Sequence, residues 1–169
     1  MRNRQTGFTM IELMTVLTIA GILIAMALPY MRDIILNQRV RAASTEAHLS
    51  LLLARSEAIK RNVNIVVART GATWNLGWKV KIASDNTVLR TSDALQNVAV
   101  DCNTDNDPAA ETCPASITFN RTGRPTSTLE YRFYIAANNK IFMRCVGITL
   151  GGQPHVEIDT DGDPTNGCQ

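Results

Sequence analysis

An apolar stretch near the amino terminus constrains this chain more than any other feature of its sequence. Residues 8–31, FTMIELMTVLTIAGILIAMALPYM, contain a single charged side chain, Glu12. As a helix they would measure about 36 Å, which is enough to cross the hydrocarbon core of a bilayer. Arg2 and Arg4 precede the stretch, and a positive flank keeps the amino end in the cytoplasm. The sequence therefore predicts one membrane-spanning helix with the rest of the chain on the outer side.

Glu12 is the anomaly in this stretch, because a carboxylate in hydrocarbon costs about 2.5–3.5 kcal/mol even on the mildest scale. A secretory signal peptide is a poor explanation, since the apolar run is too long and lacks a small-residue cleavage site. A cut before the run would remove Arg2 and Arg4 and lower the formal net charge from +2 to zero. The mature chain would then not be basic overall.

The next segment, residues 32–62, contains neither glycine nor proline, and its apolar residues recur at steps of three and four. That spacing places them on one face of an amphipathic helix. The repeated positions are Val40, Ala43, Ala47, Leu51, Ala54 and Ala58. We therefore expect the helix to continue to residue 62, and its apolar stripe to be covered by the remainder of the chain.

Residues 63–169 change to short β-branched and aromatic runs separated by turn residues, a pattern typical of strands. The runs are NVNIVVAR (62–69), WKVKIA (78–83), TVLR (87–90), VAV (98–100), SITF (116–119), EYRFYIA (130–136), KIFMRCVGITL (140–150) and HVEID (155–159). The expected fold class is α+β. A long N-terminal helix, half transmembrane and half amphipathic, packs on one antiparallel sheet of six to eight strands joined in meanders.

The four cysteines all follow the apolar stretch, on the predicted outer side where disulfides form and persist. They are Cys102, Cys113, Cys145 and Cys168. Three connectivities are possible, of which sequential pairing, with spacings of 11 and 23, is the simplest. No Cys-x2-Cys pair is present, so the spacing does not suit a zinc site.

The amino-terminal pattern resembles the class III signal of type IV prepilins and type II secretion pseudopilins. The residues that carry the resemblance are Gly7, Phe8, Thr9, Ile11 and Glu12, followed by an apolar helix. It implies that residues 1–7 are a leader, that a prepilin peptidase cleaves after Gly7, and that Phe8 is N-methylated. It also implies assembly with other minor and major pilins into a helical filament.

The resemblance supplies a reason for Glu12. Cleavage would create an α-amino group at Phe8, which is largely cationic at neutral pH. A Glu12 that meets the new amino terminus of a neighbouring subunit leaves lipid as half of a charge pair. Gly21 and Pro29 match positions where related pilins loosen the helix. The alternative is a simple membrane anchor in which Glu12 lies shallow enough to reach the interface.

Two further stretches, NLGWKVKI around Trp78 and ITFNRTGRP at 117–125, are similar to the GspH/FimT/FimU family of minor pilins and pseudopilins. The resemblance implies a single-pass protein of the bacterial inner membrane with a periplasmic domain, later part of the pilus. It favours a minor pilin of a tip or priming complex that supports pilus assembly with motility or adhesion. A type II secretion pseudopilin is the alternative. Trp74 and Trp78 are interpreted as core residues rather than a ligand site.

DNA capture is a second class of function, because FimT-type members bind transforming DNA through a C-terminal Gly-Arg-x-Arg stretch. The terminal counterpart here, Gly152-Gln153-Pro154-His155, lacks both arginines. Arg121 and Arg124 are the other candidates, but phosphate binding needs several cations. Residues 91–169 hold five basic against ten acidic residues, whereas residues 32–90 hold ten against four. DNA is therefore a possible but less favoured partner.

The remaining signals predict neither a metal site nor an enzyme. Acidic residues gather in 101–111 and 157–167, but the calcium-loop pattern is incomplete and we interpret both as polar turns. His48 and His155 have no accompanying nucleophile motif, and no glycine-rich phosphate loop is present. We expect no cofactor and no catalytic residues.

Overall fold

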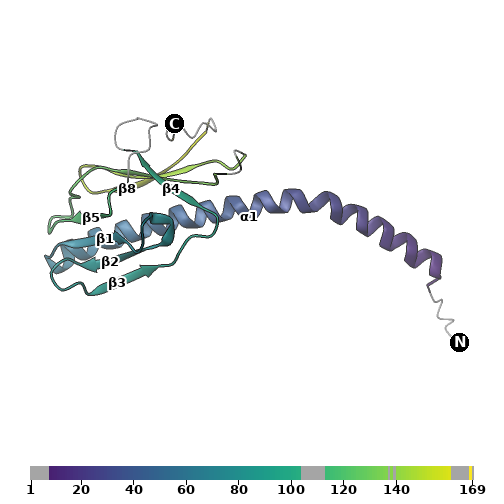
Figure 1. Ribbon diagram of the computed structural model, residues 1–169, viewed down its shortest axis with the longest axis horizontal. Helices are drawn as coiled ribbons and strands as arrows, with labels where there is room; N and C mark the ends of the chain where they lie inside the picture. The colour runs from purple at the N-terminus through teal and green to yellow at the C-terminus, as the bar shows by residue number, and fades with distance from the viewer. Residues whose placement is uncertain (1–7, 104–112, 137, 139, 161–167, 169) are drawn as a thin grey trace, which may run out of the picture. The chain divides into compact units, whose positions relative to one another are not determined.

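The computed structural model describes residues 8–103, 113–136, 138, 140–160 and 168, with the backbone alone for residues 27–29. The chain forms two compact units, Met1–Ile35 and Leu36–Gln169. One helix, α1 (Met10–Arg61), contributes its first half to the first unit and its second half to the second. All strands of the described residues belong to the second unit (Figure 1).

Helix α1 ends where the sequence changes to strand-forming residues. Asn62 has a φ of 53°, in the left-handed region that asparagine tolerates. The N–H of Val63 then donates to the carbonyl of Ala58 at 3.3 Å, which is the bond of a Schellman cap. Lys60 and Arg61 lie in the last turn, where cations stabilise the helix dipole. The helix predicted for residues 8–62 thus runs from Met10 to Arg61.

The described strands form two four-stranded antiparallel sheets, with orders β3-β2-β1-β5 and β4-β6-β7-β8. The first contains β1 (Ile65–Arg69), β2 (Trp78–Ile82), β3 (Val88–Ser92) and β5 (Ser116–Phe119). The second contains β4 (Ala99–Asn103), β6 (Glu130–Tyr134), β7 (Arg144–Ile148) and β8 (Pro154–Ile158). A short 3-10 helix, η1 (Trp74–Leu76), precedes β2.

We expected a single sheet built as a meander, and this expectation is wrong because the strands form two sheets. Every predicted run overlaps a strand, but β5 pairs with β1 and not with β4 or β6, its neighbours in sequence. The chain therefore passes from the second sheet back to the first between β4 and β5. Alternation of apolar residues tells which side chains are buried, but it does not tell which backbone edge a strand joins.

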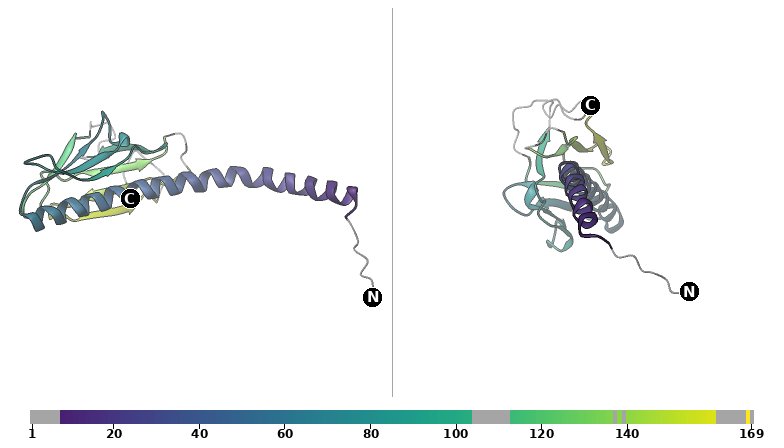
Figure 2. Two further views of the ribbon diagram at one scale, coloured as in Figure 1. Left: turned by 90° about the horizontal axis from the view of Figure 1, so that it is seen from below. Right: turned by 90° about the vertical axis from the view of Figure 1, so that its right-hand side faces the viewer.

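The core lies between α1 and the two sheets. All six helical positions of the predicted stripe are buried, with exposed fractions of 0–7%. The strands contribute alternate residues to the same core, among them Ile65, Val67, Val80, Ile117, Phe119, Tyr131, Phe133, Val146 and Ile148. Figure 2 shows both sheets packed along the C-terminal part of α1. The prediction that the chain covers its own amphipathic stripe is confirmed.

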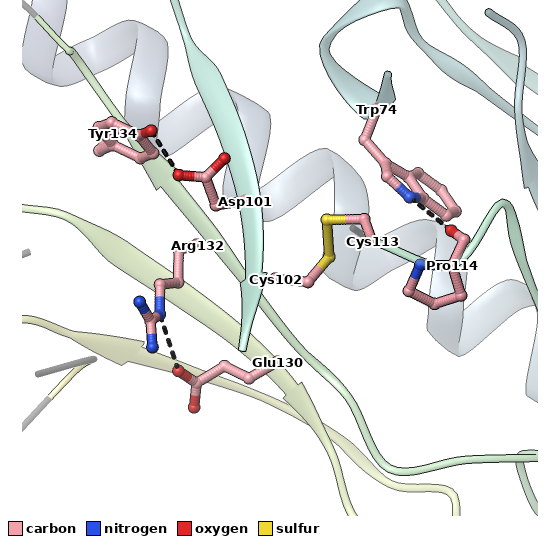
Figure 3. Close-up of a disulfide and its surroundings, with 8 residues drawn as sticks. All are labelled: Trp74, Asp101, Cys102, Cys113, Pro114, Glu130, Arg132 and Tyr134. Carbon is pink, nitrogen blue, oxygen red and sulfur yellow. Dashed lines mark hydrogen bonds and ion pairs between the residues drawn. A yellow bond between two sulfur atoms is a disulfide. The ribbon is translucent and has the colours of Figure 1, made fainter. Parts of the chain in front are cut away.

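A disulfide joins the two sheets (Figure 3). Cys102 in β4 is bonded to Cys113, which lies just before β5. Next to it, the indole N–H of Trp74 donates to the carbonyl of Pro114 at 2.9 Å, and the Trp74 ring packs edge-on against Tyr131 with 4.8 Å between centroids. The disulfide therefore ties β4 of the second sheet to the segment that leads into β5 of the first sheet.

Two more contacts complete this framework. Cys145 in β7 is bonded to Cys168, so the pairing of the four cysteines is the sequential one. The indole N–H of Trp78 donates to the hydroxyl of Ser50 on α1 at 3.0 Å. Trp74 and Trp78 are only 4% and 2% exposed, which makes them core residues, as interpreted from the sequence.

Candidate assembly site

The first turn of α1 is capped by a side chain. The Oγ1 of Thr9 accepts a hydrogen bond from the backbone N–H of Glu12 at 3.3 Å, and the Thr9 carbonyl accepts one from Leu13 at 3.2 Å. Thr9 is therefore the N-cap residue, and Thr-x-x-Glu is the spacing of a capping box. Glu12 lies in the first turn, where the helix dipole stabilises a negative charge.

The carboxylate of Glu12 itself has no hydrogen-bond or ion-pair partner in the part of the chain that the structure describes. Phe8, the predicted methylation residue, is 82% exposed. Gly7, the predicted cleavage residue, lies outside the described residues. The start of α1 therefore presents an uncovered carboxylate next to an uncovered aromatic side chain.

The rest of the first unit is an apolar helix without cover. We call residues 8–35 the N-terminal rod. The large apolar side chains that the structure describes there are 47–82% exposed, and they are Phe8, Met10, Ile11, Leu13, Met14, Val16, Leu17, Ile19, Ile22, Leu23, Ile24, Met26, Tyr30, Met31, Ile34 and Ile35. They occur on every side of the helix, which is typical of a helix buried in lipid or among other helices.

The polar side chains in the middle of the rod are satisfied within the helix. The hydroxyl of Thr15 donates to the carbonyl of Glu12 at 2.9 Å, and that of Thr18 donates to the carbonyl of Met14 at 2.8 Å. A hydroxyl bonded in this way tolerates an apolar environment, because no donor is left without an acceptor.

By length and composition, no single helix of the described residues qualifies as a membrane span. The segments Met10–Met26 and Tyr30–Arg61 meet the same criterion when they are taken together across a bend.

Gly21 and Pro29 both lie inside α1. A Cβ added at Gly21 would meet no atom within 4 Å, so the described part of the chain leaves room for a larger side chain there. For Pro29 only the backbone is described. A glycine inside a helix lowers its stability relative to alanine, so Gly21 makes this part of α1 easier to deform.

The outer face of the second sheet carries a polar group next to the Cys102–Cys113 bridge (Figure 3). The hydroxyl of Tyr134 donates to the carboxylate of Asp101, and the Arg132 guanidinium lies 3.9 Å from the Glu130 carboxylate. Burial, followed by the hydrogen bond to Asp101 and then by the charge of that carboxylate, raises the pKa of Tyr134 to about 12. Burial also raises the pKa of Glu130, although Arg132 acts in the opposite direction. A tyrosine is protonated at neutral pH even at its ordinary pKa of 10, so Tyr134 remains the donor to Asp101.

The two loops that the sequence offered for DNA binding lie against one another. Gly152, in the β7–β8 turn, has a φ of +77°, and a Cβ built on it would lie 1.9 Å from the carbonyl oxygen of Gly123. Arg55 of α1 donates from Nη2 to a carbonyl of the same turn at 3.2 Å. Arg121 and Arg124 are exposed beside Gly123. The fold thus brings together three arginines that are separated by up to 69 positions in the sequence.

Among the described residues, no group of three or more His, Cys, Asp or Glu side chains is placed to hold a metal ion. The acidic residues of the two loops interpreted as polar turns lie mostly outside those residues, at 104–112 and 161–167. His48 lies on α1 and His155 lies on β8. The ring of His155 covers Gly147 of β7.

Two structural roles in this description were not predicted from the sequence. Thr9 is the helix cap, and the Thr-x-x-Glu spacing was a signal that could have identified it. Arg55 binds the β7–β8 turn across a sequence separation of 96 residues, and no local pattern indicates such a contact.

Comparisons with known proteins agree with the architecture. The family description of the type II transport protein GspH matches residues 43–152, and that of a prokaryotic N-terminal methylation motif matches residues 2–28. The search of curated protein sequences returned no match.

Two solved structures have a similar fold. The type IV minor pilin FimU of Pseudomonas aeruginosa is 15% identical, with a TM-score of 0.58 over 75% of this chain and 92% of that one. The minor pseudopilin EpsH from the type 2 secretion system of Vibrio cholerae is 12% identical, with a TM-score of 0.53 over 71% and 97%. A long N-terminal helix with antiparallel sheets packed on its second half is thus a pilin-like fold.

Proposed function

The chain belongs to the GspH family of type II transport proteins, and from this premise we propose that it is a minor pilin of a type IV pilus. In this proposal it is anchored in the bacterial inner membrane by residues 8–31, with its globular domain in the periplasm, until it enters the filament. Its place is the tip or priming complex, where it supports pilus assembly and the motility or adhesion that depends on the pilus.

The observation that carries the proposal is the uncovered carboxylate of Glu12 at the start of an uncovered apolar helix. The chain supplies cover for the apolar stripe of residues 40–58, but none of the described residues covers the rod or pairs with Glu12. Exposed apolar surface of this extent is stable only in lipid or against other subunits.

The chemistry of assembly follows from this arrangement. A prepilin peptidase would cut after Gly7 and leave a cationic amino group at Phe8. Within one molecule this group and Glu12 flank the same helical turn, and in a filament the Glu12 carboxylate pairs with the amino group of the adjacent subunit. Since each ion separately is costly in an apolar environment, the pair favours the assembled state over the dispersed one.

The test is to replace Glu12 by the isosteric neutral residue, Glu12→Gln, in the full chain. Membrane fractionation should show unchanged insertion, while the amount recovered in sheared filaments should fall at least about tenfold, the ratio for about 1.4 kcal/mol of lost pairing. Thr15→Val, which removes a hydroxyl one turn further on but no charge, serves as the control. If Glu12→Gln were recovered in sheared filaments in the same amount as the wild type, the proposal would be contradicted.

Deletion of the gene distinguishes a minor pilin of a type IV pilus from a type II secretion pseudopilin, because a different process fails in each case. Loss of pili or of twitching motility with normal protein secretion supports the pilus assignment. Loss of secretion with intact pili supports a type II pseudopilin and overturns the pilus assignment, although it leaves the role of Glu12 unchanged.

DNA binding is a second candidate, because the contact between Gly123 and Gly152 gathers Arg55, Arg121 and Arg124 at one place. Three cations neutralise few phosphates, so binding would be weak and strongly dependent on salt. We expect that Arg121→Gln/Arg124→Gln abolishes any mobility shift of duplex DNA at low salt, whereas Arg69→Gln on β1 does not. Equal shifts for both variants would exclude this role for the two loop arginines.

A further inference from the structure

Arg144, on β7, points toward the helix although it is charged. Side chains alternate along a strand, so Arg144 shares its face with Val146 and Ile148, which are 0% and 3% exposed core residues. In the adjacent strand β6 its register partner is Phe133, which is 1% exposed. The guanidinium therefore lies at the end of the core, between the second sheet and α1.

Arg144 has no acceptor for its charge in the described residues. Its Nε is buried and makes no hydrogen bond, and neither Arg144 nor Arg41 takes part in an ion pair there. Burial lowers the pKa of Arg144, and the positive charge of Arg41 on α1 lowers it further. Arg41 therefore acts on Arg144 as a like charge, which is unfavourable at the edge of an apolar core in the isolated chain.

Two acidic residues flank Ile158 in the chain, of which Asp159 is 1% exposed and Glu157 faces the other way. Glu157 on β8 is the register partner of Cys145, and it therefore lies on the opposite face of the sheet from Arg144. Glu130 on β6 lies on that opposite face as well, next to Arg132. The chain folds without bringing either glutamate to the Arg41–Arg144 pair.

The surface around the pair is apolar. β8 is an edge strand of its sheet, and Ile158, the register partner of Arg144, is 48% exposed although it points to the core side. Val156, two residues earlier on the same face, is 38% exposed. A partly buried guanidinium beside exposed aliphatic side chains suits a carboxylate that arrives on an apolar protein surface.

We propose that Arg41 and Arg144, with the rim formed by Val156 and Ile158, are a docking site for an acidic side chain of an adjacent filament subunit. The inference rests on the proposed function, since it requires a filament. It adds a second charged contact, on the globular domain, to the one made by Glu12. A lipid headgroup would satisfy the two cations but would leave the rim of β8 uncovered, so we assign the site to a protein.

The site can be tested by comparing stability with assembly in the same variants. Arg41→Gln/Arg144→Gln should fold with an unchanged or higher midpoint of thermal unfolding in detergent, because it removes like charges from the edge of the core. Its recovery in sheared filaments should fall about tenfold, as expected for loss of a partly desolvated charge contact. Lys79→Gln, which removes a partly exposed cation from β2 on the other sheet, should change neither quantity.

Wild-type recovery of Arg41→Gln/Arg144→Gln would overturn the inference, and so would a lowered midpoint, which would indicate that the arginines stabilise the fold. A photo-crosslinking residue at position 158 should yield adducts with a subunit peptide that contains Asp or Glu, and adducts with lipid alone would overturn the assignment. Measuring the recovery of Glu12→Gln in sheared filaments separates the docking site from the proposed function. If Glu12→Gln is lost from filaments while Arg41→Gln/Arg144→Gln is retained, the docking site is rejected and the proposed function stands.

Discussion

The two halves of α1 have the same secondary structure and opposite surroundings. Among the described side chains of residues 10–35 the large apolar ones are exposed on all sides, whereas in residues 36–61 one apolar stripe is buried and the exposed faces are mainly polar, with Leu49, Leu52 and Ile59 as apolar exceptions. The contrast holds for a single residue type, since Leu17 is 63% exposed and Leu51 is 2% exposed. The second half is stabilised by strands of its own chain. The first half has to be covered by something else.

This difference separates what stabilises the protein from what assembles it. Most helical stability in proteins comes from tertiary packing of an apolar face and not from helix propensity. The second half obtains this packing on folding, so substitutions there act on the free energy of unfolding. Substitutions in the N-terminal rod should instead act on membrane insertion or on contacts with other subunits.

The largest expected effect comes from truncating the same side chain in each half. Leu51→Ala should lower the free energy of unfolding of the globular unit by about 2–5 kcal/mol, because it leaves a cavity among packed side chains. Leu17→Ala should leave that quantity unchanged. Denaturant unfolding of the full chain in detergent, followed by tryptophan fluorescence, measures both, since Trp74 and Trp78 belong to the core. Equal losses would contradict the division into a packed half and an uncovered half.

Replacing one glycine in each half of the comparison should change stability by a smaller amount, with opposite signs for Gly152 and Gly21. Gly152→Ala places a Cβ 1.9 Å from a backbone oxygen at a positive φ, and it should destabilise the globular unit by about 1–3 kcal/mol. Gly21→Ala meets open space and should stabilise the isolated helix by about 1 kcal/mol. Circular dichroism of the two variants separates these effects. If Gly21→Ala also reduced filament recovery, position 21 would be a contact between subunits.

The smallest effect concerns the half-buried carboxylate of Glu130, in contrast to the exposed Glu12. Because burial raises the pKa of Glu130 above its ordinary value of 4.5, its favourable contribution is present below pH 4.5 and is lost as the pH rises through the folded-state pKa. Glu130→Gln should therefore stabilise the protein slightly at pH 7, by less than about 1 kcal/mol, and have no effect near pH 4. Thermal unfolding at both pH values tests this. Destabilisation at pH 7 would mean that attraction to Arg132 outweighs burial.

Much of the architecture could be read from periodicity. The stripe from Val40 to Ala58 is buried as its spacing predicted, and each predicted β run overlaps a strand. Periodicity is informative here because helix and strand expose one face in different repeats, and burial selects that face. The pairing of β5 with β1 could not be read, because strands of similar composition compete for the same edge and only the whole core decides between them.

The candidate site divides in the same way. Glu12 and the uncovered rod follow from the order of residues 8–31 alone, because a continuous apolar run with one carboxylate has few environments in which it is stable. The contact between Gly123 and Gly152, and the effect of the Arg41 charge on Arg144, required the tertiary structure. These pairs are distant in sequence, and each depends on the register and the twist of sheets that no local pattern encodes.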